Sequence, residues 1–257
     1  MKVEYYQNCY YRVYDEMETK QLFMPVFDKI FVSPDHLNSL TSSPIRGSAL
    51  FRDPTWKIIG FGSAAWGGIS SYIRPSAPKK CVQHDRETDK WDLLRPLYVT
   101  LVEREVDEVI HMNRLKTSDH EHRAENGAIS SLPLANTTTR ANLEPLNILT
   151  SGCMFSRDGD WGLFGDDDTV TILGGEPQLM ARVIELAGGE DFLRTDFDQC
   201  WIDHYVMSAP VDHDWTFACY ECIGWPVPDI IRNLEPGQSL DRSHLSWIND
   251  VADKGRE

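Results

Sequence analysis

The fold class follows from one stretch of the chain, residues 158–189, which reads DGDWGLFGDDDTVTILGGEPQLMARVIELAGG. In its first half, turn-forming Asp and Gly separate two short runs, residues 161–164 and 169–173, whose aromatic and β-branched residues favour strands. Its second half starts a helix at Pro177 and repeats apolar residues at helical spacing until Gly188-Gly189, a residue type that commonly ends helices. Strands joined by tight turns and followed by a helix predict an α+β fold.

The flanking sequence extends this pattern in both directions. Strands are predicted over residues 3–14, 27–32, 56–61 and 216–223, helices over residues 34–40, 98–110 and 191–205, and a final short element over residues 245–248. Residues 99–102, taken alone, also suit a strand. Since no long linker divides the chain, we expect an antiparallel sheet with helices packed on one face, in a single α+β domain spanning residues 1–257.

The net charge is distributed unevenly along the chain. The 257 residues carry 25 Lys and Arg against 40 Asp and Glu, a formal charge of −15. Residues 1–150 account for −1 and residues 151–257 for −14, so the domain has a near-neutral half and an acidic half. The acidic half is either a solvated face that keeps the protein soluble or a negative field that steers a basic partner.

Composition excludes several classes of protein. Eight Trp, nine Tyr and ten Phe in a chain that is 41% hydrophobic can fill a core. No apolar run reaches the roughly 18–20 residues needed to cross a bilayer, and the N-terminus lacks the apolar region of a secretory signal. We therefore expect a cytoplasmic protein that has no membrane partner. Its excess of acids also argues against binding nucleic acid, whose phosphates require clustered Lys and Arg.

Acidic residues concentrate around one predicted turn. Asp166, Asp167 and Asp168 follow Asp158 and Asp160 within eleven residues. Carboxylates on a flexible loop can ligate Ca²⁺ or Mg²⁺, but the spacing lacks the glycine and terminal Glu of an EF-hand. These acids have two other interpretations. They either form tight turns between strands or make up an acidic rim that faces a protein partner.

Cysteines and histidines raise the alternative of an enzyme or a zinc protein. Cys219 and Cys222 have the spacing that lets two thiolates hold one zinc, and His204 and His213 lie nearby in the sequence. The alternative interpretation is that Cys219 and Cys222 are simply two small buried residues of an aromatic strand. Because no nucleophile or phosphate-loop motif is present, we predict no catalytic residue, no metal site and no cofactor.

Residues 152–200 resemble a group of acidic bacterial proteins. This segment resembles the C-terminal region of toxin immunity proteins. The resemblance lies in the run Trp161-Gly162-Leu163-Phe164-Gly165-Asp166, the triplet Leu173-Gly174-Gly175 and the amphipathic helix that follows. The resemblance implies a cytoplasmic, non-enzymatic antitoxin that covers the active site of a cognate toxin, often a basic nuclease. It carries no catalytic signature that could be transferred residue by residue.

These observations predict an acidic protein-binding inhibitor, of the immunity type, whose partner is a basic protein such as a toxin or nuclease domain. The predicted partner-binding acids are Asp166, Asp167, Asp168, Asp196, Asp198 and Asp203. Trp161 and Trp201 are the predicted aromatic anchors, provided that they are exposed. A rival hypothesis is a decoy that mimics nucleic acid and inhibits a defence nuclease.

Overall fold

The computed structural model describes the helices and strands that form the body of the protein. The described residues are 2–6, 9–32, 50–62, 84–85, 90–91, 95–106, 108–113, 129–133, 152–165, 170–207 and 213–244. The predicted elements at residues 34–40 and 245–248 lie outside these ranges.

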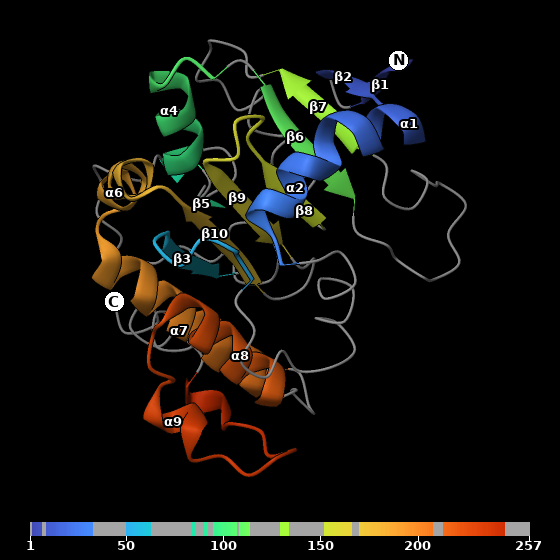
Figure 1. Cartoon of the computed structure of the whole chain (residues 1–257). Coiled ribbons are helices and arrows are strands. Elements are labelled where there is room, and N and C mark those ends of the chain that lie inside the picture. The colour runs from blue at the N-terminus through green and yellow to red at the C-terminus, as the bar shows by residue number, and fades with distance from the viewer. Residues whose placement is uncertain are drawn as a thin grey trace.

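One antiparallel sheet of eight strands runs through the described structure (Figure 1). Its order is β1 (Lys2–Tyr6), β2 (Cys9–Val13), β7 (Ile129–Pro133), β6 (Glu108–Asn113), β8 (Gly152–Phe155), β9 (Trp161–Gly165), β10 (Val170–Gly175) and β3 (Lys57–Gly62). A separate two-stranded sheet pairs β4 (His84–Asp85) with β5 (Lys90–Trp91). Because β3 pairs with β10, strands from the near-neutral and the acidic halves belong to the same sheet.

Helical segments pack around this sheet. They are α1 (Glu16–Glu18), the π-helical turn η1 (Thr19–Phe23), α2 (Met24–Ile30), α4 (Arg95–Glu103), α6 (Pro177–Leu186), α7 (Glu190–Met207), α8 (His213–Ile223), α9 (Asp229–Arg232) and the 3₁₀ turn η3 (Arg242–His244). The predicted α+β class, with an antiparallel sheet and packed helices, is confirmed. None of the described helices has the length and apolar character needed to cross a membrane.

Glycines in adjacent strands let α2 approach the sheet closely. Gly162 of β9 and Gly174 of β10 are paired across the ladder, and we call this pair the glycine floor. A Cβ atom on Gly174 would lie 2.6 Å from the ring of Phe51, and one on Gly162 would lie 2.6 Å from Ile30 and 2.8 Å from Phe31. Only hydrogen therefore fits at these two positions.

A third glycine, Gly60, lets the C-terminal helices pack closely on the same face of the sheet as α2. Gly60 pairs with Ile172, which lies two residues before Gly174 and so points to the same side of the sheet. The side chains of Phe197 from α7 and Ile223 from α8 lie 2.6 Å and 2.7 Å from where a Cβ of Gly60 would be. The helices α2, α7 and α8, from both ends of the chain, thus pack on one face. All five residues of β9 are buried, so the opposite face is covered as well.

The first half of the chain departs from the prediction at residues 27–32. The expected strand is wrong, because α2 continues to Ile30 and only Phe31 forms a bridge with Phe51. Phe23, Phe27 and Ile30, spaced by four and three residues, bury one helical side against the sheet. The apolar content of this segment alone did not distinguish the spacing of a helix from that of a strand.

The predicted helix over residues 98–110 is correct only in its first part. The helix α4 ends at Glu103, and the amide of Val106 donates to the carbonyl of Leu101 while Glu105 adopts a φ of 58°. A left-handed residue with this hydrogen bond is a common helix ending. The following apolar residues belong to β6, where Val109 and Ile110 are buried.

The predicted strand over residues 216–223 is a helix. Thr216, Cys219, Tyr220 and Ile223 of α8 are all buried, at spacings that define one side of a helix. By contrast, the strands at residues 161–164 and 169–173 and the helices after Pro177 and Gly189 are confirmed.

Candidate protein-binding surface

Helices α7 and α8 form an antiparallel pair beside β3 (Figure 1). The hydroxyl of Tyr205 near the end of α7 lies 3.1 Å from the hydroxyl of Thr216 near the start of α8. Further along the same helix pair, the ring centroids of Phe197 in α7 and Tyr220 in α8 are 5.1 Å apart. These contacts fix which sides of the two helices face outward.

Two of the predicted partner-binding acids lie inside this layer. Asp196 is 4% exposed and Asp203 is 8% exposed. The side-chain amide of Gln199 donates a hydrogen bond of 2.8 Å to Asp203. Their positions differ from the surface location predicted for them, because the phase of α7 turns them inward.

Asp198 is part of a link between the two helices. The Tyr220 hydroxyl donates a hydrogen bond of 2.7 Å to its carboxylate, and Arg194 lies 3.8 Å away on the preceding turn. Burial raises the pKa of Asp198, against the opposing effects of Tyr220 and Arg194. Burial, with the nearby carboxylate, also raises the pKa of Tyr220. Asp198 is thus already engaged within the protein.

The predicted aromatic anchors do not meet the condition of exposure. Trp161 and Trp201 are both fully buried, Trp161 in the central strand β9 and Trp201 edge-to-face with Phe197. Both indoles belong to the hydrophobic core. Asp166, Asp167 and Asp168 lie outside the described residues, so their role stays a prediction.

A second link joins the start of α7 to the sheet. The ammonium of Lys57 lies 2.6 Å from Glu190, and the indole N–H of Trp225 donates to the same carboxylate oxygen at 3.1 Å. The two donors lower the pKa of Glu190 below its usual value, with Lys57 making the larger contribution. This carboxylate, too, has a structural role.

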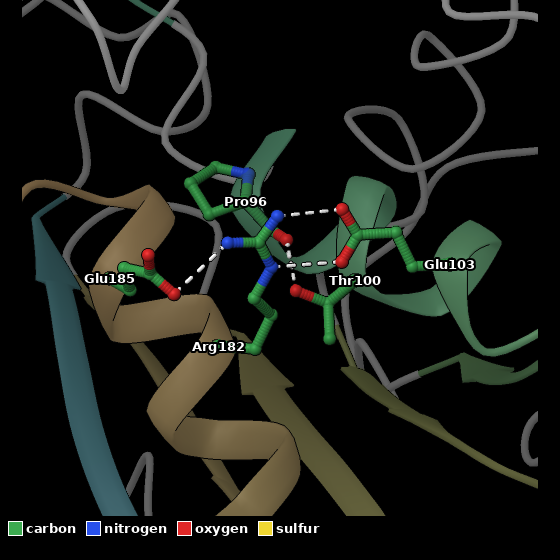
Figure 2. Close-up of polar contacts among 5 residues, drawn as sticks. All are labelled: Pro96, Thr100, Glu103, Arg182 and Glu185. Carbon is green, nitrogen blue, oxygen red and sulfur yellow. Dashed lines mark hydrogen bonds and ion pairs between the residues drawn. The ribbon is translucent and has the colours of Figure 1, made fainter.

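A third link joins α6 to α4. As Figure 2 shows, the guanidinium of Arg182 forms two hydrogen bonds with Glu103, of 2.8 Å and 2.7 Å, and a third of 3.0 Å with Glu185. In the same view Thr100 donates to the carbonyl of Pro96 within α4. The bonds from Arg182 lower the pKa of Glu103. Arg182, one of the few arginines of the acidic half, is therefore paired within the protein.

Most remaining acids of the C-terminal helical part face solvent. We use this name for residues 170–207 and 213–244, which contain twelve Asp and Glu and four Arg. Eight of the twelve acids are exposed: Glu176, Glu185, Asp191, Asp214, Glu221, Asp229, Glu235 and Asp241. The negative character of this half is therefore a surface property in the described structure, carried mainly by acids that sequence reasoning did not select.

The outward side of α8 combines two of these acids with an aromatic ring. Asp214, Phe217 and Glu221 are all exposed, and we call them the α8 stripe. Their spacing of three and four residues places them on one side of the helix. Sequence reasoning missed this set because the predicted strand began at residue 216 and left Asp214 outside the element, whereas α8 begins at His213. The spacing itself was the signal, once α8 is known to be a helix.

Three cysteines lie in the helices near this surface, and none of them is fully exposed. Cys219 and Cys200 are buried, and burial raises the pKa of Cys222 to about 11. The backbone N–H of Leu50 donates to the Cys222 sulfur. A free thiol with this pKa is protonated near neutrality and is therefore a weak nucleophile.

The histidines of the enzyme hypothesis have packing contacts. His204 lies edge-to-face with Trp201, and His213 lies against Tyr205. Within the described ranges, no group of three or more His, Cys, Asp or Glu side chains could hold a metal ion.

Comparison of the chain with family models, curated proteins and solved structures gave no match. The resemblance of residues 152–200 to immunity proteins therefore stays a prediction.

Proposed function

We propose that this chain is a cytoplasmic, acidic, protein-binding inhibitor of the immunity type, which neutralises a basic toxin domain by covering its active site. The observation that supports this proposal is the surface charge of the C-terminal helical part. There, exposed carboxylates outnumber arginines two to one, with eight against four. A surface of this kind steers a basic protein during encounter and repels acidic ones.

The mechanism requires no chemistry from the inhibitor. A toxin that acts on nucleic acid binds phosphate with Lys and Arg, and the carboxylates of the inhibitor pair with those same groups. The structural links described above join α7 to α8 and to β3, which favours acids that are positioned before the partner arrives. Such preorganisation lowers the entropic cost of binding.

Growth rescue tests the proposal. The product of the gene adjacent to the one encoding this chain is expressed in a host cell, alone and together with this chain, and colonies are counted. We expect the neighbour to be toxic and the chain to restore growth. If the neighbour is toxic and the chain does not restore growth or bind it, the proposal is wrong.

Charge reversal tests the location of the binding surface. The variant Glu221→Lys/Glu235→Lys alters exposed acids of the C-terminal helical part, and Asp28→Lys/Glu105→Lys alters exposed acids of the other half by the same net charge. We expect the first variant to slow association with the neighbour by about tenfold at low salt, and less at high salt. Equal slowing by both variants would show that total charge, and not its location, matters.

A further inference from the structure

Phe217 is an exposed aromatic ring held in place within an acidic surface. Among the described residues, the exposed large apolar side chains are Met17, Leu22 and Phe217, and of these only Phe217 is aromatic. Its exposed fraction is 36%, and the imidazole of His213 lies 6.2 Å from its ring at an interplanar angle of 39°. The contact supports the ring without covering it.

Two carboxylates flank this ring on the same side of α8. Asp214 lies three residues before Phe217 and Glu221 four residues after it, so their Cβ atoms are on the order of 5–6 Å from that of Phe217. Glu221 forms no ion pair with any described residue. Glu221 and the exposed part of the Phe217 ring are thus open to a ligand from solvent.

The chemistry of this arrangement matches one kind of side chain. A guanidinium group is planar, stacks on an aromatic face and donates paired hydrogen bonds to carboxylates. An ammonium group satisfies the carboxylates but lacks the planar surface that stacks. Anionic groups are repelled by Asp214 and Glu221.

We infer that the α8 stripe binds an arginine side chain of the basic partner, with the guanidinium stacked on Phe217 and hydrogen-bonded to Glu221. This inference rests on the proposed function for the identity of the partner, but the recognition of arginine is a property of the stripe alone. It names the contact that supplies specificity, whereas the wider acidic surface supplies steering.

Peptide binding tests the stripe directly. Fluorescence anisotropy is measured for labelled peptides of nine arginines and of nine lysines with the full chain. We expect the wild-type protein to bind the arginine peptide about two- to fivefold more tightly than the lysine peptide. Phe217→Leu, which keeps an apolar side chain without the ring, should remove this preference, and Phe217→Tyr should retain it.

Two matched controls separate the stripe from the general field. Glu235→Gln changes the net charge by the same amount as Glu221→Gln, and Met17→Ala removes another exposed apolar side chain. Glu221→Gln should weaken arginine binding by more than Glu235→Gln does, and Met17→Ala should leave it unchanged. An unchanged arginine preference in Phe217→Leu, equal effects of the two Glu variants, or no peptide binding at low salt would each overturn the inference.

The growth assay distinguishes this inference from the proposed function. If wild type restores growth and Phe217→Leu does so equally well with an unchanged arginine preference, the inhibitor role stands and the stripe assignment is wrong. If wild type fails to restore growth while the ring-dependent preference is present, the stripe binds arginine but the inhibitor role is wrong.

Discussion

The two helical layers that pack on the same sheet face are held in different ways. The N-terminal layer packs mainly through apolar rings: Phe31 lies tilted against Phe51, 5.5 Å between ring centroids, above the glycine floor. The C-terminal layer contains polar links, such as the Tyr220 hydroxyl on Asp198, and a buried acid, Asp203. Both layers pack closely over glycine, but the second also has side-chain hydrogen bonds between its two helices.

This difference shows that the acidic half has two populations of carboxylates. Asp196, Asp198, Asp203 and Glu190 are buried or engaged by donors of the protein itself. Exposed acids such as Glu221 are available to a partner. A charge total counts both populations equally, so it overstates the size of the binding surface.

The largest expected effect is in the apolar layer. Gly174→Ala places a methyl group 2.6 Å from the ring of Phe51 and should lower the free energy of unfolding by about 1–3 kcal/mol. Urea denaturation measures the loss. Phe51→Leu in the same chain should recover part of it, because the two changes share one contact. An unfolding midpoint equal to that of wild type in Gly174→Ala would show that the glycine floor has no role in packing.

The next largest effect concerns the polar links. Tyr220→Phe leaves the half-buried carboxylate of Asp198 without its hydroxyl donor, at an expected cost of about 1–2 kcal/mol. Tyr205→Phe is the matched control, since it removes a bond between two neutral hydroxyls and should cost less. Urea denaturation of both variants compares them. The reverse order would mean that solvent, and not Tyr220, satisfies Asp198.

Sequence patterns predicted those parts of the fold whose periodicity and end signals agree. For α6, Pro177 at the start, apolar spacing and Gly188-Gly189 at the end all indicate one helix, and the structure has it. For α8, aromatic and β-branched residues favoured a strand, but burial against α7 and β3 determined the helix. That contact joins residues far apart in the chain, so local composition could not reveal it.

The candidate surface was predictable only at the level of the region. The charge distribution located it in the acidic half, where the C-terminal helical part exposes eight acids. Which acids face outward depends on the rotational phase of each helix. Asp203 is buried, whereas its neighbour His204, one position further along α7, is half-exposed. The α8 stripe was not predicted because α8 was assigned as a strand.

A smaller, pH-dependent effect is expected at Glu190. Lys57 and Trp225 lower its pKa from the usual 4.5, so the folded protein releases this proton more readily than the unfolded chain does. The stabilisation is therefore complete above that value and is lost as the pH falls through the lowered pKa. Asp198 has the opposite sign: its raised pKa makes ionisation costly, and acid relieves the cost.

Substitution of Glu190 isolates its contribution. Because the pair is partly exposed, Glu190→Gln should lower the free energy of unfolding by less than about 1 kcal/mol at about pH 7, and by progressively less as the pH falls below 4.5 and through the lowered pKa. Asp191→Asn, at the next and more exposed position of the same helical turn, is the control and should leave the pH profile of wild type in place. Denaturation curves across this pH range provide the measurement. A deficit in Glu190→Gln that persists at low pH would assign the effect to packing.

The smallest effect is expected at the α4–α6 contact drawn in Figure 2, even though its hydrogen bonds are short. Arg182 and Glu103 are both exposed enough for water and salt to screen their attraction, so geometry overstates their contribution to stability. Arg182→Gln should lower the melting temperature slightly in dilute buffer and not at all in about 1 M salt, where the Debye length is about 3 Å. Glu185→Gln, which removes only the bond within α6, should change it less. A loss in Arg182→Gln that exceeds that of Tyr220→Phe would contradict this ranking, because it would show that an exposed ion pair stabilises the protein more than a half-buried hydrogen bond.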